Sequence, residues 1–138
     1  MSFKKINTIH EELGSYKIDK IIDGYEGVEI YICSTQGSAI TGVFKFDCYY
    51  GYRSFNEGEI YRYLESCNIK GSGVYSSTNS SFLDWAKEQS IEKELPEGLF
   101  NYIFASIESI FDILAFAPPQ FKLIDINKYK EIVKHPTS

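Results

Sequence analysis

Apolar and polar residues alternate with period two along three segments near the start of the chain. The segments are 16–22, 28–33 and 39–50. In the third segment, Phe44 and Phe46 fall on one face and Lys45 falls on the other. The turns between the segments are too short for crossover helices, so the pattern predicts an antiparallel three-stranded meander.

Apolar residues recur with helical spacing in other segments, several of which begin with a capping residue. Asn56 precedes a segment in which Glu59 can reach back to the cap, and Ser81 and Asp84 have the spacing of a second capping box. Ser106 is predicted to cap a further helix that ends before the two prolines at 118 and 119. The predicted helices are 7–14, 57–67, 81–88, 107–114 and 128–133.

Three more strands complete the predicted fold. The strongly apolar and aromatic run 99–105 predicts a central strand, 121–124 predicts a last strand, and a short strand is expected at 74–75. A run of strands precedes mixed elements, and the chain has no internal repeat or linker. We therefore predict a single α+β domain over residues 1–138, with an antiparallel sheet of about five strands that starts with the meander and carries the helices on it.

Charge narrows the classes of partner. The net charge is −5, and the segment from Asp84 to Asp112 holds seven acidic residues against two lysines, a balance equal to that of the whole chain. Only two of the 14 basic residues are arginine, the residue that favours bidentate phosphate contacts. We therefore expect no nucleic-acid partner. Because no apolar run is long enough to span a bilayer and no apolar stretch follows Lys4 and Lys5, we expect a cytoplasmic protein that binds no membrane.

The residues that commonly carry catalysis are scattered. Cys33 and Cys48 fall on predicted strands and Cys67 on a predicted helix, so we expect reduced, mostly buried thiols. His10 and His135 stand alone near the two ends, which predicts neither a metal site nor a catalytic base. The sequence contains no nucleophile elbow and no phosphate-binding loop. We therefore expect no enzymatic activity and no cofactor.

Two surfaces are candidates for binding. The first, which we call the aromatic corner, is residues 49–59, and its candidate binding residues are Tyr49, Tyr50, Tyr52, Arg53, Glu57 and Glu59. Tyrosine and arginine carry much of the binding energy at protein interfaces, because each pairs a large apolar area with a polar end. The alternative is a packed aromatic corner in which Arg53 pairs with a local glutamate.

The second candidate surface is acidic. Its candidate binding residues are Glu88, Glu92, Glu94 and Glu97. Charge of one sign would attract a basic partner and accelerate its association. The alternative is a hydrated loop.

The aromatic corner also carries a resemblance to known proteins. Residues 43–46 followed by Gly51-Tyr52-Arg53-Ser54-Phe55-Asn56-Glu57-Gly58-Glu59 resemble a group of small bacterial proteins in which a strand runs into a GYR-x-x-x-EG corner and then a helix. Residues 101–106, 111–114 and 118–119 are similar to the last strand, helix and proline-containing end of that group. The similarity covers about residues 28 to 124. In size and charge, this group is similar to immunity proteins of polymorphic-toxin and contact-dependent growth inhibition systems.

The resemblance implies a function in toxin inhibition. Its partner would be a cognate protein toxin, expected to be basic, such as a nuclease, whose active site the acidic chain would cover. Tyr52, Arg53 and Glu57 occupy positions shared with the group, without assigned roles. A different hypothesis is a small-molecule-binding domain or enzyme, with a pocket between sheet and helices lined by Asp47, Glu57 and tyrosines. A third is a scaffold or homodimer that pairs through an exposed strand.

Overall fold

The computed structural model describes residues 3–6, 14–35, 40–56, 61–69 and 71–134. These ranges contain nine strands and three helices, which confirms the α+β class. The strands are β1 (Lys4–Lys5), β2 (Tyr16–Gly24), β3 (Gly27–Ser34), β4 (Thr41–Phe46), β5 (Gly51–Asn56), β6 (Gly73–Ser77), β7 (Phe100–Ala105), β8 (Ser109–Ala115) and β9 (Gln120–Leu123). The helices are α1 (Tyr61–Ser66), α2 (Ser81–Gln89) and α3 (Ile126–Lys134).

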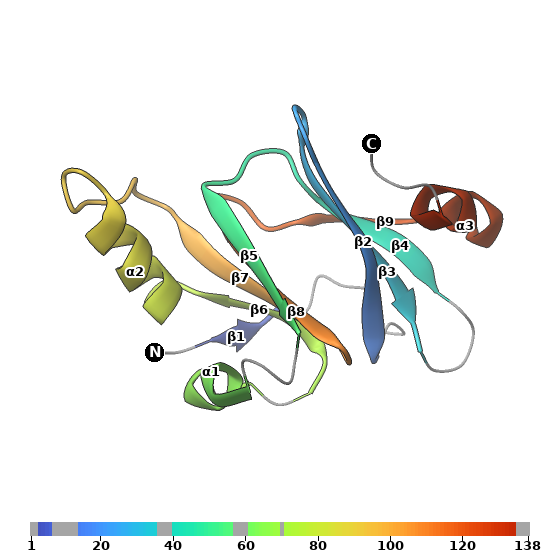
Figure 1. The fold of residues 1–138 in the computed structure, drawn as a ribbon, viewed down its shortest axis with the longest axis horizontal. Helices are drawn as coiled ribbons and strands as arrows, with labels where there is room; N and C mark the ends of the chain where they lie inside the picture. Colours follow the sequence, from blue (N-terminus) through green and yellow to red (C-terminus); the bar gives the residue numbers. More distant parts are fainter. Residues whose placement is uncertain (1–2, 7–13, 36–39, 57–60, 70, 135–138) are drawn as a thin grey trace.

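The strands form two antiparallel sheets rather than one. The five-stranded sheet has the order β1-β6-β7-β8-β5, and the four-stranded sheet has the order β2-β3-β4-β9. The predicted meander is confirmed as β2, β3 and β4, and β9 pairs with β4 to complete its sheet. Figure 1 shows the two sheets side by side, with α1 and α2 beside the five-stranded sheet and α3 beside the other.

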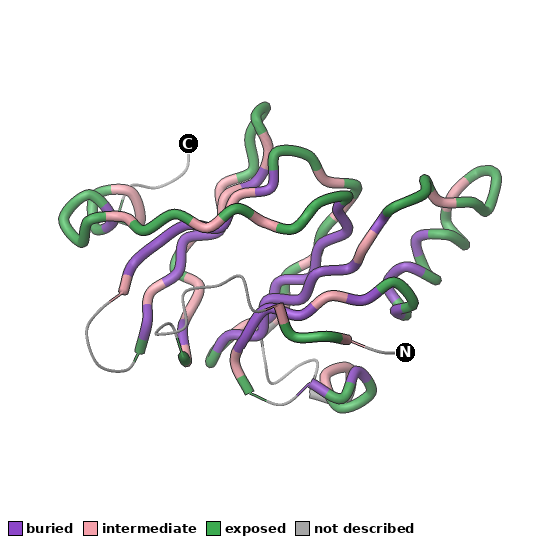
Figure 2. The backbone as a smooth tube through the Cα atoms, turned by 180° about the vertical axis from the view of Figure 1, so that it is seen from behind, coloured by how far each residue is buried: buried purple, intermediate pink, exposed green. Residues whose placement is uncertain are grey.

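The main core lies between the two sheets. Alternate residues of each strand point to the same side, so β3 and β4 supply Ile30 and Phe44 while β7 and β8 supply Phe104 and Phe111. The ring of Phe104 packs against Phe44, with 5.0 Å between centroids, and against Phe46, with 5.9 Å. Figure 2 shows buried residues, in purple, along strands of both sheets. Its apolar area is the main source of stability.

The helices bury smaller clusters on the outer faces of the sheets. On the four-stranded sheet, Tyr129 of α3 contacts Tyr31 and Val43 and donates a hydrogen bond to Asp19, 2.7 Å away. On the five-stranded sheet, α2 buries its apolar side chains against Leu114, and residues in and after α1 pack against Ile103 and Ile110. The α1 and α2 clusters contact different parts of that face.

Several predicted elements are confirmed, with small shifts in their bounds. The strands predicted at 74–75, 99–105 and 121–124 are β6, β7 and β9, and the helices predicted at 81–88 and 128–133 are α2 and α3. The cap of α2 is Ser80 rather than Ser81, since the Ser80 hydroxyl accepts the N–H of Leu83 at 3.1 Å. The helix predicted at 7–14 lies almost wholly outside the described residues, as does the start of the helix predicted after Asn56.

The helix predicted at 107–114 is wrong, because this segment is β8. It is apolar on both faces, since Phe111 and Ile113 face the main core while Ile110 and Leu114 face the outer clusters. A strand buried on both sides has no alternation to distinguish it from a helix. Ser106 does accept an N–H three residues on, from Ser109 at 3.0 Å, but this bond closes the hairpin turn between β7 and β8.

The strand predicted over 39–50 is shorter in the structure, where β4 covers Thr41–Phe46 and residues 47–50 connect it to β5. β4 ends at Phe46, and after a short connection β5 runs antiparallel to β8 at the edge of the other sheet. The described part of the aromatic corner, residues 49–56, is mostly strand, and Asn56 is the last residue of β5. Because β4 stops early, Cys48 is exposed rather than buried, whereas Cys67 is buried and Cys33 partly so, all as free thiols.

Candidate functional site

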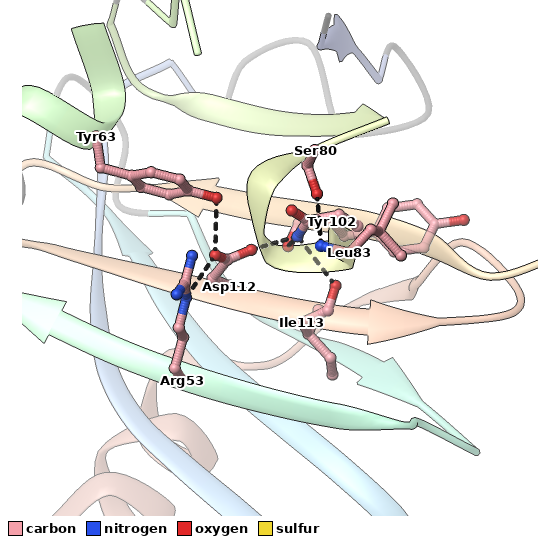
Figure 3. A network of polar contacts seen from close by, with 8 residues as sticks. Arg53, Tyr63, Ser80, Leu83, Tyr102, Asp112 and Ile113 are labelled. Atoms are coloured by element: carbon pink, nitrogen blue, oxygen red, sulfur yellow. Dashed lines mark hydrogen bonds and ion pairs between the residues drawn. The ribbon is translucent and has the colours of Figure 1, made fainter. Parts of the chain in front are cut away.

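A buried carboxylate lies at the centre of the outer face of the five-stranded sheet. Asp112 on β8 is directly opposite Arg53 on β5 in the strand register, and its side chain is 0% exposed. The Arg53 Nε donates to Asp112 Oδ2 at 2.9 Å, and the Tyr63 hydroxyl donates to the same oxygen at 3.0 Å. The Asn101 amide of β7 donates to Oδ1. Figure 3 shows Arg53 and Tyr63 converging on Asp112 from β5 and α1.

Burial dominates the electrostatics of this cluster. It raises the pKa of Asp112 above its ordinary value, although the hydrogen bonds from Asn101, Arg53 and Tyr63 oppose the shift. Burial also raises the pKa of Tyr63, so the phenol stays protonated and remains a donor. The Arg53 guanidinium lies over aromatic rings, with Cζ 4.0 Å from the Phe82 centroid and 4.9 Å from that of Tyr63. These contacts fix the arginine in place.

A cavity of about 420 Å³ opens between β5 and α2, next to this cluster. The residues that line it from the β5 side are Tyr50, Gly51, Tyr52 and Arg53. The residues that line it from the α2 side are Phe82, Trp85, Ala86 and Gln89, with Ser90 after the helix, and Leu114 of β8 completes the wall. Trp85 is 57% exposed and Tyr50 is 44% exposed. The cavity therefore combines one charged side chain with a largely apolar and aromatic wall.

The residues predicted in the aromatic corner make two sets of contacts, and Tyr52 belongs to both. Tyr50, Tyr52 and Arg53 meet at the cavity. Tyr49 and Tyr52 donate hydrogen bonds to Asp23 at the end of β2, at 2.6 and 3.1 Å, and so join the edges of the two sheets. The hydrogen bond to Asp23 is the main cause that raises the pKa of Tyr49 to about 12.

The charged residues of the corner differ from the prediction. The described partner of Arg53 is Asp112, 59 residues away, rather than a local glutamate. Glu57 and Glu59 lie outside the described residues, and so does the predicted pocket wall that would bring Glu57 close to Asp47. Asp47 itself is exposed and pairs with Lys45 at 3.8 Å.

The predicted acidic surface lies on α2 and on the loop that follows it. Its four glutamates, Glu88, Glu92, Glu94 and Glu97, are all exposed. Lys93 partly offsets them, with its Nζ 3.7 Å from Glu88. Asp112, counted with this segment in the sequence, contributes nothing to the surface because it is buried and paired with Arg53.

Four residues of the site were missed by reasoning from the sequence. They are Tyr63, Trp85, Asn101 and Asp112. Asp112 did carry a signal, because it is a single charged residue inside the apolar run 110–115. A charge in such a strand requires a partner, but nothing in the local sequence points to Arg53. Trp85 stands close to the apolar residues Phe82, Leu83 and Ala86 of α2, so the local sequence does not show that it is exposed.

The described residues contain no group of three His, Cys, Asp or Glu side chains that could hold a metal ion. None of the described helices is both long enough and apolar enough to cross a membrane. Comparisons with protein-family models, with curated proteins and with solved structures found no match. The chemistry of the site therefore rests on its own geometry.

The raised pKa of Asp112 predicts a pH dependence of stability. At a pH between 3.8, the ordinary pKa of the Asp112 carboxyl, and its higher pKa in the folded chain, the folded chain holds a proton that the unfolded chain has lost. The contribution of Asp112 to stability is therefore greatest below pH 3.8 and is lost as the pH rises through the native pKa. We expect the free energy of unfolding of the native chain, relative to Asp112→Asn, to fall over this range. Urea titrations of both proteins at a series of pH values measure the difference, and a flat or rising difference contradicts it.

Proposed function

We propose that the chain is an immunity protein that neutralises a cognate toxin domain by binding it through the surface of β5 and α2. The observation that carries the proposal is the set of exposed aromatic side chains around the cavity. Trp85 and Tyr50 are 57% and 44% exposed, respectively. Tyr52 turns to the opposite face of β5 from Arg53, where its ring contacts Phe111. Large aromatic residues that line a concave surface are typical anchors of protein interfaces.

Charge around these aromatics supports a basic partner. Glu88 lies on the same helix as Trp85, and Glu92, Glu94 and Glu97 follow within nine residues of that helix's end. An apolar and aromatic centre beside a charged rim is the usual organisation of an interface. A toxin that cleaves nucleic acid needs a basic active site, and exposed carboxylates can occupy the positions of phosphates there. Binding would then need no catalytic group on this chain.

The rigidity of the surface also favours binding. Arg53 is held by Asp112 and by the rings of Phe82 and Tyr63, and Tyr52 is held by Asp23. Side chains ordered before association lose less conformational entropy when the complex forms. The same contacts that stabilise the edge of the sheet therefore favour tight association.

The proposal is tested with the toxin domain encoded beside this chain's gene. The triple variant Glu92→Lys, Glu94→Lys and Glu97→Lys is expected to weaken the complex by roughly tenfold or more and to reduce its dependence on salt, because attraction becomes repulsion. Isothermal titration calorimetry at two salt concentrations measures both effects. The matched control is Glu26→Lys, Glu108→Lys and Glu131→Lys, which makes the same change of charge at other exposed positions. No complex at micromolar concentration contradicts the proposal.

A second candidate function is a small-molecule-binding domain. It is favoured by the volume of the cavity, about 420 Å³, which lies within the range of roughly 300 to 1,000 Å³ that ligand pockets occupy. The described wall differs from the predicted one, because its charged residue is Arg53 rather than Asp47 or a glutamate.

A further inference from the structure

The charge that lines the cavity between β5 and α2 is positive. Arg53 contributes to the wall, and its side chain is 32% exposed. A guanidinium has five N–H donors, and the hydrogen bond to Asp112 uses the one on Nε. The four N–H groups on the two Nη nitrogens take no part in that bond. Because Asp112 is fully buried behind Arg53, a ligand in the cavity can contact the cation without approaching the carboxylate.

The rest of the wall is suited to an apolar group. Phe82, Trp85 and Leu114 present ring and aliphatic surface, while Tyr50 and Gln89 supply polar atoms nearer the solvent. A ligand that contacts both Arg53 and the apolar wall needs an anionic end for the guanidinium and an apolar body for the rings. Arginine binds planar carboxylates in two-pronged geometry, and burial of the apolar body adds the hydrophobic contribution.

We propose that this cavity binds a small apolar monocarboxylate, with Arg53 donating to the carboxylate and the apolar body lying against Phe82 and Trp85. This binding site goes beyond the proposed toxin inhibition and does not depend on it. The N–H groups of Arg53 offer the ligand hydrogen-bond donors, which a carboxylate can accept and a cationic group cannot. The exposed glutamates of α2 and its loop disfavour ligands of higher negative charge.

Gly51 keeps the cavity open. It lies two residues before Arg53 on β5, so a side chain at this position would point to the same face of the sheet. A Cβ atom built there would meet no heavy atom within 4 Å. Gly51 is the first residue of β5, and its lack of a side chain leaves empty space beside Arg53.

The substitution Gly51→Val follows from this geometry. Valine has a high strand propensity, and its side chain would occupy part of the volume that the ligand needs. We expect Gly51→Val to raise the melting temperature or leave it unchanged, and to weaken ligand binding by about tenfold or more. Loss of binding together with an intact fold separates occlusion of the site from unfolding.

The experiment is a fluorescence titration of the full chain. Trp85 is the only tryptophan in the sequence and lines the cavity, so its emission reports on the site without a label. The probe is 3-phenylpropanoate, and its neutral control is 3-phenylpropanamide. We expect a saturable change with the acid and binding at least about tenfold weaker with the amide, because the amide lacks the charge that Arg53 recognises.

Two variants and one peptide complete the test. Gly51→Val is expected to weaken binding of the acid by about tenfold or more, and the double substitution Arg53→Met with Asp112→Asn is expected to abolish it. The double substitution removes both charges together, so no buried charge is left unpaired. Equal binding of acid and amide, or unchanged binding by either variant, overturns the proposal.

The peptide Gly-Gly-Phe, with a free or amidated carboxyl end, is titrated alongside. Binding of the free peptide without binding of 3-phenylpropanoate would assign the site to the carboxyl terminus of a partner chain and overturn the small-molecule form.

Discussion

Replacing Arg53 by methionine is expected to lower the free energy of unfolding by about 3 kcal/mol. The substitution leaves the carboxylate of Asp112 fully buried without its cation, and a buried charge without a partner is costly. Tyr63 and Asn101 still donate hydrogen bonds to Asp112, and the arginine is itself partly exposed. The loss of stability should therefore lie at the lower end of the range of about 3–5 kcal/mol that is typical when one partner of a buried ion pair is removed. Equilibrium unfolding in urea measures the change.

The control for this prediction is the double substitution Arg53→Met with Asp112→Asn. An asparagine at this position can still hydrogen-bond with Tyr63 and Asn101 but carries no charge, so most of the lost stability should return. A coupling energy between the two positions of about 1 kcal/mol or more is expected, because they are in direct contact. If the single and double variants are equally unstable, Arg53 acts through its packing on Phe82 rather than through Asp112.

The substitution Phe104→Ala is expected to destabilise the chain by about 4 kcal/mol, within the range for buried phenylalanines. Its ring is fully buried and contacts Phe44, Phe46 and Phe111, so the cavity left behind borders both sheets. Such a site cannot collapse without moving one sheet against the other. The measurement is the midpoint and slope of urea denaturation.

Phe116→Ala is the matched control for Phe104→Ala. The side chain of Phe116 is 42% exposed, so removing it should change stability by no more than about 0.5–1 kcal/mol. A large loss from Phe116→Ala, or a small one from Phe104→Ala, would contradict the assignment of the main core to the space between the sheets.

The fold could be predicted from the sequence where each strand alternates or where a segment is bounded by turn residues. The meander of β2, β3 and β4 meets that condition, and so do β7 and β9 with their flanking turns. The prediction failed at β8, because a strand buried on both faces lacks alternation and its apolar residues also fit helical spacing. Because β8 was not predicted as a strand, its pairing partner β5 was not predicted either. The division of the strands into two sheets was therefore not predicted.

The candidate site could be predicted only in part. Tyr50, Tyr52 and Arg53 were identified by residue type and local density, and they do meet at one cavity. Asp112 and Trp85 reach the same place from β8 and α2, through strand pairing and helix packing over long separations in sequence. Residue types and spacings carry no information on such pairings until the order of the strands is known.

The strand order has a consequence for how the chain is made. Its path passes from the five-stranded sheet to the other after β1, returns after β4, and passes back after β8, so each sheet contains segments from distant parts of the chain. On the ribosome, β2, β3 and β4 emerge first, while the edge of β4 that pairs with β9 awaits residues 120–123. At ordinary rates of elongation this interval is on the order of ten seconds, during which an unpaired strand edge is open to other nascent chains.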